Sequence, residues 1–130
     1  MQGKNILVTG ASSGIGKETA LYLAKQGATV ILTARNEARL EEVKKAMGEH
    51  VYSYVCNLNE LENVQAIFEF CKEKDLKLDG MVHAAGISSP IPVRSVSVES
   101  MEETMHVNCM SFAELGKYFC SKKYSNENAA

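Results

Sequence analysis

Three glycines stand where a phosphate-binding turn needs them. Gly10, Gly14 and Gly16 follow the apolar run 6–8 and precede a stretch with helical periodicity. A glycine turn between a strand and a helix leaves free N–H groups and the positive end of the helix dipole facing an anion. The first glycine permits the tight turn, the second lets the backbone approach a pyrophosphate, and the third allows close helix–strand packing. The residues expected to form this dinucleotide site are Gly10, Ser12, Ser13, Gly14, Ile15 and Gly16.

The obvious competing motif is the P-loop of nucleoside triphosphatases. That motif requires a glycine five residues before its second glycine, and a serine or threonine directly after its lysine. Here Ala11 stands five residues before Gly16, and Glu18 follows Lys17. The P-loop interpretation therefore fails at two positions.

Composition narrows the class of protein. A chain of 130 residues is long enough for one domain with a real core, and a net charge of −2 does not indicate a nucleic-acid partner. Apolar runs such as 30–32 are far too short to span a bilayer, and no signal peptide precedes the first strand. The four cysteines lack C-x-x-C spacing, and the three histidines lack metal-ligand spacing. We expect a cytoplasmic protein without a metal site, whose cysteines are reduced thiols packed as small apolar groups.

Strand and helix signals alternate along the chain. Apolar or β-branched runs predict strands over 6–8, 29–33, 51–56 and 80–83. Helical periodicity predicts helices over 14–26, from Asn36 to Gly48, from Asn59 onward, over 97–104 and over 107–122. This alternation favours an α/β fold, a doubly wound parallel sheet with helices on both faces. Right-handed crossovers give the strand order 3-2-1-4.

These motifs together resemble the short-chain dehydrogenase/reductase family. The spacing Thr9-Gly10-x-x-x-Gly14-x-Gly16 is similar to its phosphate loop, and His83-Ala84-Ala85-Gly86 stands where the family usually has Asn-Asn-Ala-Gly. Cys56-Asn57-Leu58 stands where the family usually has Asp-Leu, and Val107-Asn108 matches its helical asparagine. The resemblance implies a Rossmann-like nucleotide domain. It places Asn57 and Leu58 near the adenine and Ala84, Ala85 and Gly86 near the ribose, and it gives Asn108 a structural and catalytic role.

The end of the second predicted strand bears on the choice of cofactor. An acidic residue about 20 residues beyond the glycine loop would bind the ribose 2′-hydroxyl of NAD. That strand instead ends in Ala34-Arg35, which has no carboxylate to repel a 2′-phosphate. The Arg35 guanidinium can pair with such a phosphate through two hydrogen bonds. We therefore expect NADP rather than NAD.

Members of the resembled family complete catalysis with a serine and a Tyr-x-x-x-Lys pair after a fifth strand. Tyr118 and Lys122 have that spacing, but Tyr118 lies ten residues after Asn108 in the same helical pattern, roughly 15 Å along one axis. We expect Tyr118 to pack or to lie at an interface. The chain is then the nucleotide-binding half of a larger reductase, truncated before the fifth strand, with a domain over 1–124 and a frayed polar tail over 125–130.

The function expected is therefore that of an oxidoreductase. It would transfer hydride between NADP(H) and a small carbonyl or alcohol substrate, and the 130-residue chain alone would be inactive. The fourth strand and the last helix would lack neighbours, and the full-length parent is expected to be a homo-oligomer. The alternative is a non-catalytic nucleotide-binding or assembly module, because the catalytic serine and tyrosine–lysine pair are absent.

Overall fold

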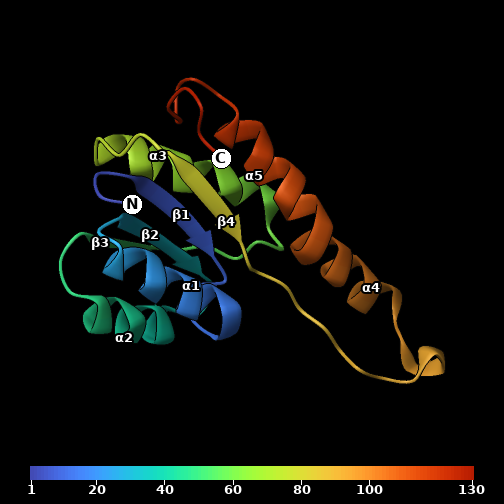
Figure 1. Ribbon diagram of the computed structural model, residues 1–130. Helices are drawn as coiled ribbons and strands as arrows, with labels where there is room; N and C mark the ends of the chain where they lie inside the picture. Colours follow the sequence, from blue (N-terminus) through green and yellow to red (C-terminus); the bar gives the residue numbers. More distant parts are fainter.

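Four short strands form a parallel sheet in the computed structural model, which describes residues 1–130. Their order across the sheet is β3-β2-β1-β4, as the sequence predicts. The carboxyl ends of the strands therefore meet along one edge, which carries the loops discussed below (Figure 1). The strands are β1 (Asn5–Thr9), β2 (Thr29–Ala34), β3 (Val51–Val55) and β4 (Gly80–His83).

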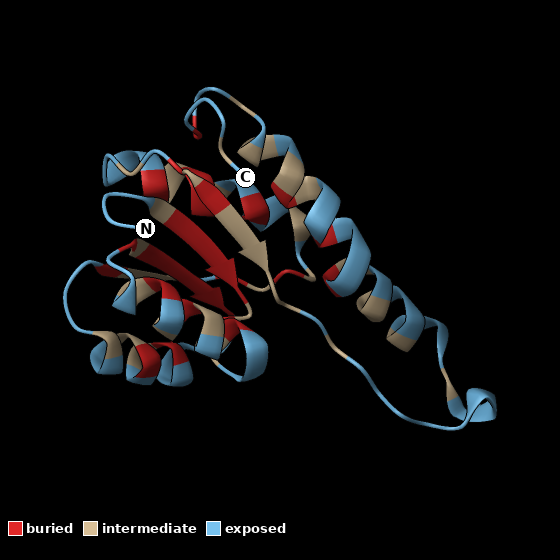
Figure 2. Ribbon diagram, in the orientation of Figure 1, coloured by how far each residue is buried: buried red, intermediate tan, exposed pale blue.

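Helices cover both faces of the sheet (Figure 1). Successive side chains of a strand point to opposite faces, so the continuous apolar run of β1 feeds two cores. Val8 belongs to the buried cluster that contains Leu40 of α2, whereas Leu7 belongs to the cluster with Phe68 of α3 and Leu115 of α5. The central strands β1 and β2 are the most deeply buried part of the chain (Figure 2). The helices are α1 (Gly14–Lys25), α2 (Glu37–Met47), α3 (Val64–Glu73), α4 (Val98–Met105) and α5 (Ser111–Phe119).

A side chain caps α2, whereas no side chain caps α3. The Asn36 side chain accepts a hydrogen bond from the Arg39 N–H at 3.0 Å, which caps α2. The third helix begins later than the sequence predicts. The Asn57 side chain accepts the Asn59 N–H at 3.0 Å, and a 3₁₀ turn over Leu61–Asn63 precedes α3. Asn59 therefore lies in a turn, and the helix proper begins at Val64.

The two last predicted helices form one rod. A π-helical turn over His106–Met110 joins α4 to α5, where the sequence predicts two separate helices. Helix α5 ends at Phe119 rather than at Lys122. π-turns insert one extra residue into a helix and frequently occur at functional sites. Asn108, which the resemblance assigns to catalysis, lies inside this turn.

The carboxyl-terminal segment 125–130 does not fray, contrary to expectation. It runs beside β4: Leu78 and Ser125 form a parallel bridge, and the Met81 N–H donates to the Ala130 carbonyl at 2.9 Å. These bonds cover the first part of the outer edge of β4, which the sequence predicted to be open.

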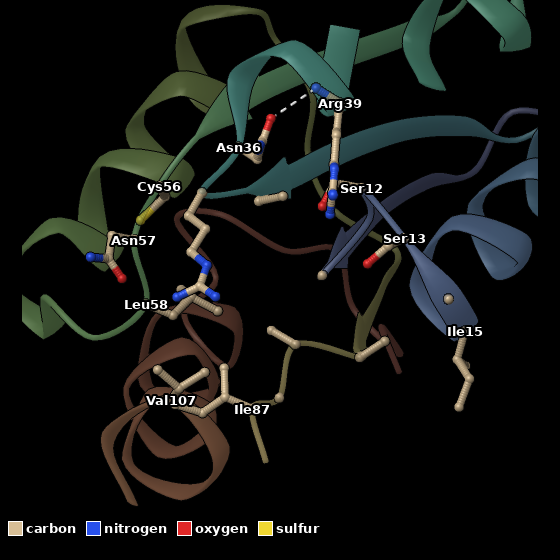
Figure 3. A pocket seen from close by; sticks show the side chains of 17 residues that line it. Ser12, Ser13, Ile15, Asn36, Arg39, Cys56, Asn57, Leu58, Ile87 and Val107 are labelled. Carbon is tan, nitrogen blue, oxygen red and sulfur yellow. Dashed lines mark hydrogen bonds between the residues drawn. The ribbon is translucent and has the colours of Figure 1, made fainter. Parts of the chain in front are cut away.

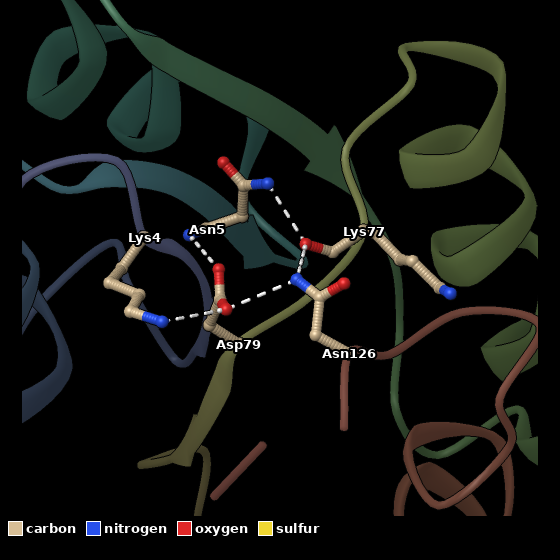
Figure 4. Close-up of polar contacts among 5 residues, drawn as sticks. All are labelled: Lys4, Asn5, Lys77, Asp79 and Asn126. Carbon is tan, nitrogen blue, oxygen red and sulfur yellow. Dashed lines mark hydrogen bonds and ion pairs between the residues drawn. The ribbon is translucent and has the colours of Figure 1, made fainter. Parts of the chain in front are cut away.

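One carboxylate ties both ends of the chain to the start of β4. Asp79 accepts hydrogen bonds from the Asn5 N–H at 2.9 Å, from the Asn126 amide at 3.1 Å and from Lys4 at 3.2 Å (Figure 4). Burial raises the pKa of Asp79, but these hydrogen bonds outweigh it and hold the pKa below its ordinary value. The segment that the sequence presents as a tail is thus part of the fold.

The four cysteines divide into two kinds. All are free thiols; Cys56 and Cys71 are buried, whereas Cys109 and Cys120 are exposed. Burial, with a smaller contribution from Glu60, raises the pKa of Cys56 to about 11, and burial raises that of Cys71 to about 12. The expectation of small packed thiols therefore holds for the buried pair only. No helix has the length and apolar character needed to cross a membrane.

Candidate nucleotide-binding site

A cavity of about 590 Å³ opens at the carboxyl ends of the strands. Most of the residues predicted for the dinucleotide site lie around it, although they come from four separate loops. Two do not: Gly16 lies beneath the loop, and Asn108 lies behind the wall. The lining residues are Gly10, Ser12, Ser13, Gly14, Ile15, Ala34, Arg35, Asn36, Arg39, Cys56, Asn57, Leu58, Ala84, Ala85, Gly86, Ile87 and Val107.

Two glycines of the first loop are required by close packing. A Cβ atom on Gly10 would stand 2.7 Å from the Ala85 nitrogen, and one on Gly16 would stand 2.3 Å from the Gly10 carbonyl oxygen. Both contacts are with backbone, which cannot move aside easily. Gly10 thus brings the first loop against the loop after β4, and Gly16 brings α1 against the first loop. The short distance at Gly16 explains the role predicted for the third glycine, which is close packing between the helix and the strand.

Gly14 is different, because it faces open space. Its φ of +53° lies in the left-handed region, yet nothing lies within 4 Å of where a Cβ atom would stand. The adjacent Ser13 is the N-cap of α1 and makes no side-chain hydrogen bond to it. The first N–H groups of α1 therefore have no side-chain cap and remain available to an anion. Ile15, which also lines the cavity, is 80% exposed.

Two guanidinium groups stand at the end of β2 and the start of α2. Arg35 directly follows the buried Ala34, and its Nη1 lies 3.9 Å from Glu103 of α4. Both side chains of this pair are largely exposed, so the attraction contributes little, about 0–1 kcal/mol. Arg39 lines the same cavity and extends from α2 toward Ser12 (Figure 3). The sequence reasoning missed Arg39, although its place in the first turn of the helix capped by Asn36 was a usable signal.

The loop after β4 forms another wall of the cavity and is fixed from behind by Asn108. The Asn108 Oδ1 accepts the Ile87 N–H at 2.7 Å, and its Nδ2 donates to the Ile87 carbonyl at 2.8 Å. A Cβ atom on Gly86 would stand 3.4 Å from the same Oδ1. The Asn108 amide therefore holds this loop, which fits the structural part of the role that the resemblance implies for this asparagine.

The first residues of the same loop are fixed by Thr9, the buried last residue of β1. Its hydroxyl oxygen accepts the N–H groups of Ala84 and Ala85, both at 3.2 Å, and lies 2.8 Å from His83 Nδ1. The partners are 74 to 76 residues apart in sequence. Such a contact is visible only once β1 and β4 are paired.

Tyr118 and Lys122 lie away from this cavity. The Tyr118 ring packs against Phe68 and Tyr124, with centroid distances of 5.6 and 6.2 Å, and its hydroxyl is 3.4 Å from Gln65 of α3. Neither residue lines the cavity. Tyr118 is a packing residue, as the sequence reasoning expected.

Comparison with known proteins agrees with this geometry. The family model for short chain dehydrogenases matches residues 4–127. An uncharacterized oxidoreductase of Staphylococcus saprophyticus is 38% identical over 112 residues, which are 83% of this chain and 48% of the relative. The L-xylulose reductase of Caenorhabditis elegans is 38% identical over 106 residues, 81% of this chain and 42% of the relative. The chain spans about half the length of the curated relatives it matches.

The solved structures point the same way. The L-sorbose reductase of Gluconobacter frateurii, solved with NADPH and L-sorbose, superposes with a TM-score of 0.84 at 28% identity. The match covers 91% of this chain and 46% of that one. The chain belongs to the short-chain dehydrogenase family, and its parallel sheet is Rossmann-like.

Proposed function

We propose that this member of the short-chain dehydrogenase family binds NADP(H) and forms the nucleotide-binding half of an oxidoreductase. Bound NADP(H) would supply hydride transfer to or from a small carbonyl or alcohol substrate. The observation that carries the proposal is Gly14, whose left-handed backbone faces open space beside the uncapped N–H groups of α1. A glycine backbone that is open on the cavity side, next to free helix N–H groups, fits a pyrophosphate at that place.

Each wall of the cavity then has a part in holding the nucleotide. The backbone from Ser12 to Gly16 would bind the pyrophosphate, and the loop 84–86 would lie along the ribose. Asn57 and Leu58 would lie beside the adenine. Leu58 is buried, and the side-chain oxygen of Asn57 accepts a hydrogen bond from the Asn59 N–H. Asn108 holds the wall at Ile87, and the catalytic role implied by the family stays a prediction.

The preference for NADP follows from charge at the end of β2. Ala34 presents no carboxylate, and the guanidinium groups of Arg35 and Arg39 both line the cavity. Two cations favour a 2′-phosphate over a 2′-hydroxyl. To bind the phosphate, Arg35 must leave its ion pair with Glu103. This costs little free energy, because both side chains of the pair are exposed. The L-sorbose reductase that superposes on this chain was solved with NADPH, which supports the assignment.

Nucleotide binding alone does not complete a reduction. A general acid or base needs a pKa near the working pH. The titratable groups lining the cavity are two guanidiniums and the Cys56 thiol, whose pKa burial raises to about 11. We therefore expect the 130-residue chain to bind NADPH without consuming it.

The surface of the α4–α5 rod supports the expectation of a homo-oligomeric parent. Met101, Met105, Met110 and Phe112 are each about half exposed, at 50%, 53%, 46% and 56%. Methionine and phenylalanine exposed together along one rod are typical of an interaction surface. We propose that this surface is buried in the assembled parent, and that the parent is cytoplasmic.

Titration of the chain with NADPH and NADH tests the proposed cofactor. Arg35→Ala should weaken NADPH binding by about 1.5–3 kcal/mol, because it removes a hydrogen bond to a charged group. This corresponds to a roughly 10- to 100-fold increase in Kd. NADH affinity should change little, because the 2′-hydroxyl carries no charge. Arg94→Ala, in the exposed turn before α4, is the matched control and should leave both affinities unchanged. Equal losses for both nucleotides would contradict the role of Arg35.

A further inference from the structure

The histidine at the end of β4 makes contacts that the proposed function does not use. His83 pairs in register with Thr9 across β1 and β4. Its Nδ1 lies 2.8 Å from the Thr9 hydroxyl, and its ring lies 5.6 Å from that of Phe112 in α5. Its buried Nε2 makes no hydrogen bond of ordinary length and angle, although the Val107 carbonyl lies close enough to affect the ring. His83 does not line the cavity, but the next two residues do.

Counting donors and acceptors fixes the protonation state of this contact. A hydroxyl has one hydrogen to donate and two lone pairs to accept with. The N–H groups of Ala84 and Ala85 occupy both lone pairs of the Thr9 oxygen. The Thr9 hydrogen must then point to His83 Nδ1, which has to be an unprotonated acceptor. The ring is therefore neutral and carries its hydrogen on Nε2.

Protonation of the ring would break this arrangement. An imidazolium carries a hydrogen on both nitrogens, so three donors would face the two lone pairs of the Thr9 oxygen. The Thr9 hydrogen would also lose its acceptor. The charged ring N–H is the strongest of the three donors, so it displaces at least one of the two backbone N–H groups, and both belong to residues in the wall of the cavity.

We propose that His83 is a positioning residue whose neutral ring, acting through the Thr9 hydroxyl, holds Ala84 and Ala85 in the nucleotide-binding wall and releases them when it is protonated. The readout in nucleotide affinity rests on the proposed function. The coupling within the chain does not, because it concerns only His83, Thr9 and the two alanines.

The surroundings of the ring contain no charged group that would compete with this effect. Three elements face it: β1 through the Thr9 hydroxyl, the π-turn through the Val107 carbonyl, and α5 through the Phe112 ring. None of these groups titrates. Burial lowers the pKa of His83, and the Val107 carbonyl raises it by less, so the pKa lies below its ordinary value. The neutral ring is thus the resting form, and release belongs to acid pH.

Nitrogen NMR of the imidazole and amide NMR of the chain test the coupling without nucleotide. We expect the neutral ring to carry its hydrogen on Nε2, and we expect the Ala84 and Ala85 amide signals to shift with the same midpoint as the His83 ring. A hydrogen on Nδ1 at neutral pH, or alanine amides that do not follow the ring, would overturn the proposal.

The affinity for nucleotide as a function of pH supplies the second readout. NADH serves as the probe, because NADPH has a 2′-phosphate that titrates in the same range. In the wild-type chain the Kd should rise by up to about tenfold per pH unit below the pKa of the ring. His83→Asn offers an amide oxygen that accepts the Thr9 hydrogen at every pH, so its affinity should stay near the neutral-pH value. His83→Phe has no acceptor, and its affinity should be low and independent of pH.

The same substitution elsewhere is the control. His50→Asn changes an exposed histidine in the turn between α2 and β3 and should keep the wild-type profile. An identical profile in wild type and His83→Asn would overturn the proposal. If no variant binds either nucleotide at pH 8, the proposed function fails, and the imidazole and amide signals still decide the role of His83.

Discussion

Substituting two glycines of one loop should separate folding from nucleotide binding. Gly10 and Gly14 both have positive φ, +64° and +53°, so alanine at either position costs about 1–2 kcal/mol of backbone strain. At Gly14 nothing else opposes the methyl group. At Gly10 the methyl group would also stand 2.7 Å from the Ala85 nitrogen and 2.8 Å from the Ala84 carbonyl. We therefore expect Gly10→Ala to be the more destabilising by several kcal/mol, since backbone must shift.

The order should reverse for nucleotide affinity among folded variants. The Gly14 methyl group would occupy the open space that we assign to the pyrophosphate. Loss of one hydrogen bond between a phosphate and an N–H group corresponds to about 1.5–3 kcal/mol, or roughly 10- to 100-fold in Kd. Urea unfolding gives the stabilities, and NADPH fluorescence titration gives the affinities. A folded Gly14→Ala variant with wild-type affinity would refute the reasoning, as would equal stabilities for the two variants.

Three further predictions concern other parts of the chain. Asp79→Asn should destabilise the chain at pH 7 by about 1–2 kcal/mol. Folding lowers the pKa of Asp79, so its contribution to the free energy of unfolding is present at neutral pH and is lost as the pH falls through the folded-state pKa. Urea unfolding at pH 7 and pH 3 should therefore show a smaller difference between the variant and the wild type in acid. Asn108→Ala removes both hydrogen bonds to Ile87 and should weaken NADPH about tenfold in the fluorescence titration, with Asn108→Asp intermediate because it keeps the acceptor. Tyr118→Phe should leave NADPH affinity unchanged and alter the unfolding free energy by less than about 0.5 kcal/mol, since its hydroxyl makes only a 3.4 Å contact; a larger loss of affinity would show that Tyr118 serves the site.

The parts of the fold that follow from local signals were predictable. The apolar run of β1 and the glycines after it predict a buried strand, a turn and a helix, and alternation along the chain predicts the sheet order. The second helix was predicted to begin at Asn36, and the side chain of that residue caps α2. These features depend on residues close together in sequence, so a single chain suffices to find them.

The parts that depend on distant residues could not be predicted. The Thr9 contacts with Ala84 and Ala85 exist only because β1 and β4 pair, and the Asn108 contacts with Ile87 need the π-turn. The segment 125–130 reads as a polar tail, because its pairing with β4 and the bond from Asn126 to Asp79 come from tertiary structure. Arg39 is the exception, because its place in the first turn of α2 is a local signal for a residue that lines the cavity.

The central claim is that the cavity at the carboxyl ends of the strands binds NADP. Amide NMR of the labelled chain during titration with NADP⁺ tests it most directly, because each wall of the cavity has its own reporters. We predict saturable shifts at the amides of residues 12–16, 35–36, 57–58 and 84–87, with little change on the outer face of α3. Shifts gathered on α3, or none at millimolar NADP⁺ in a folded chain, would contradict the claim.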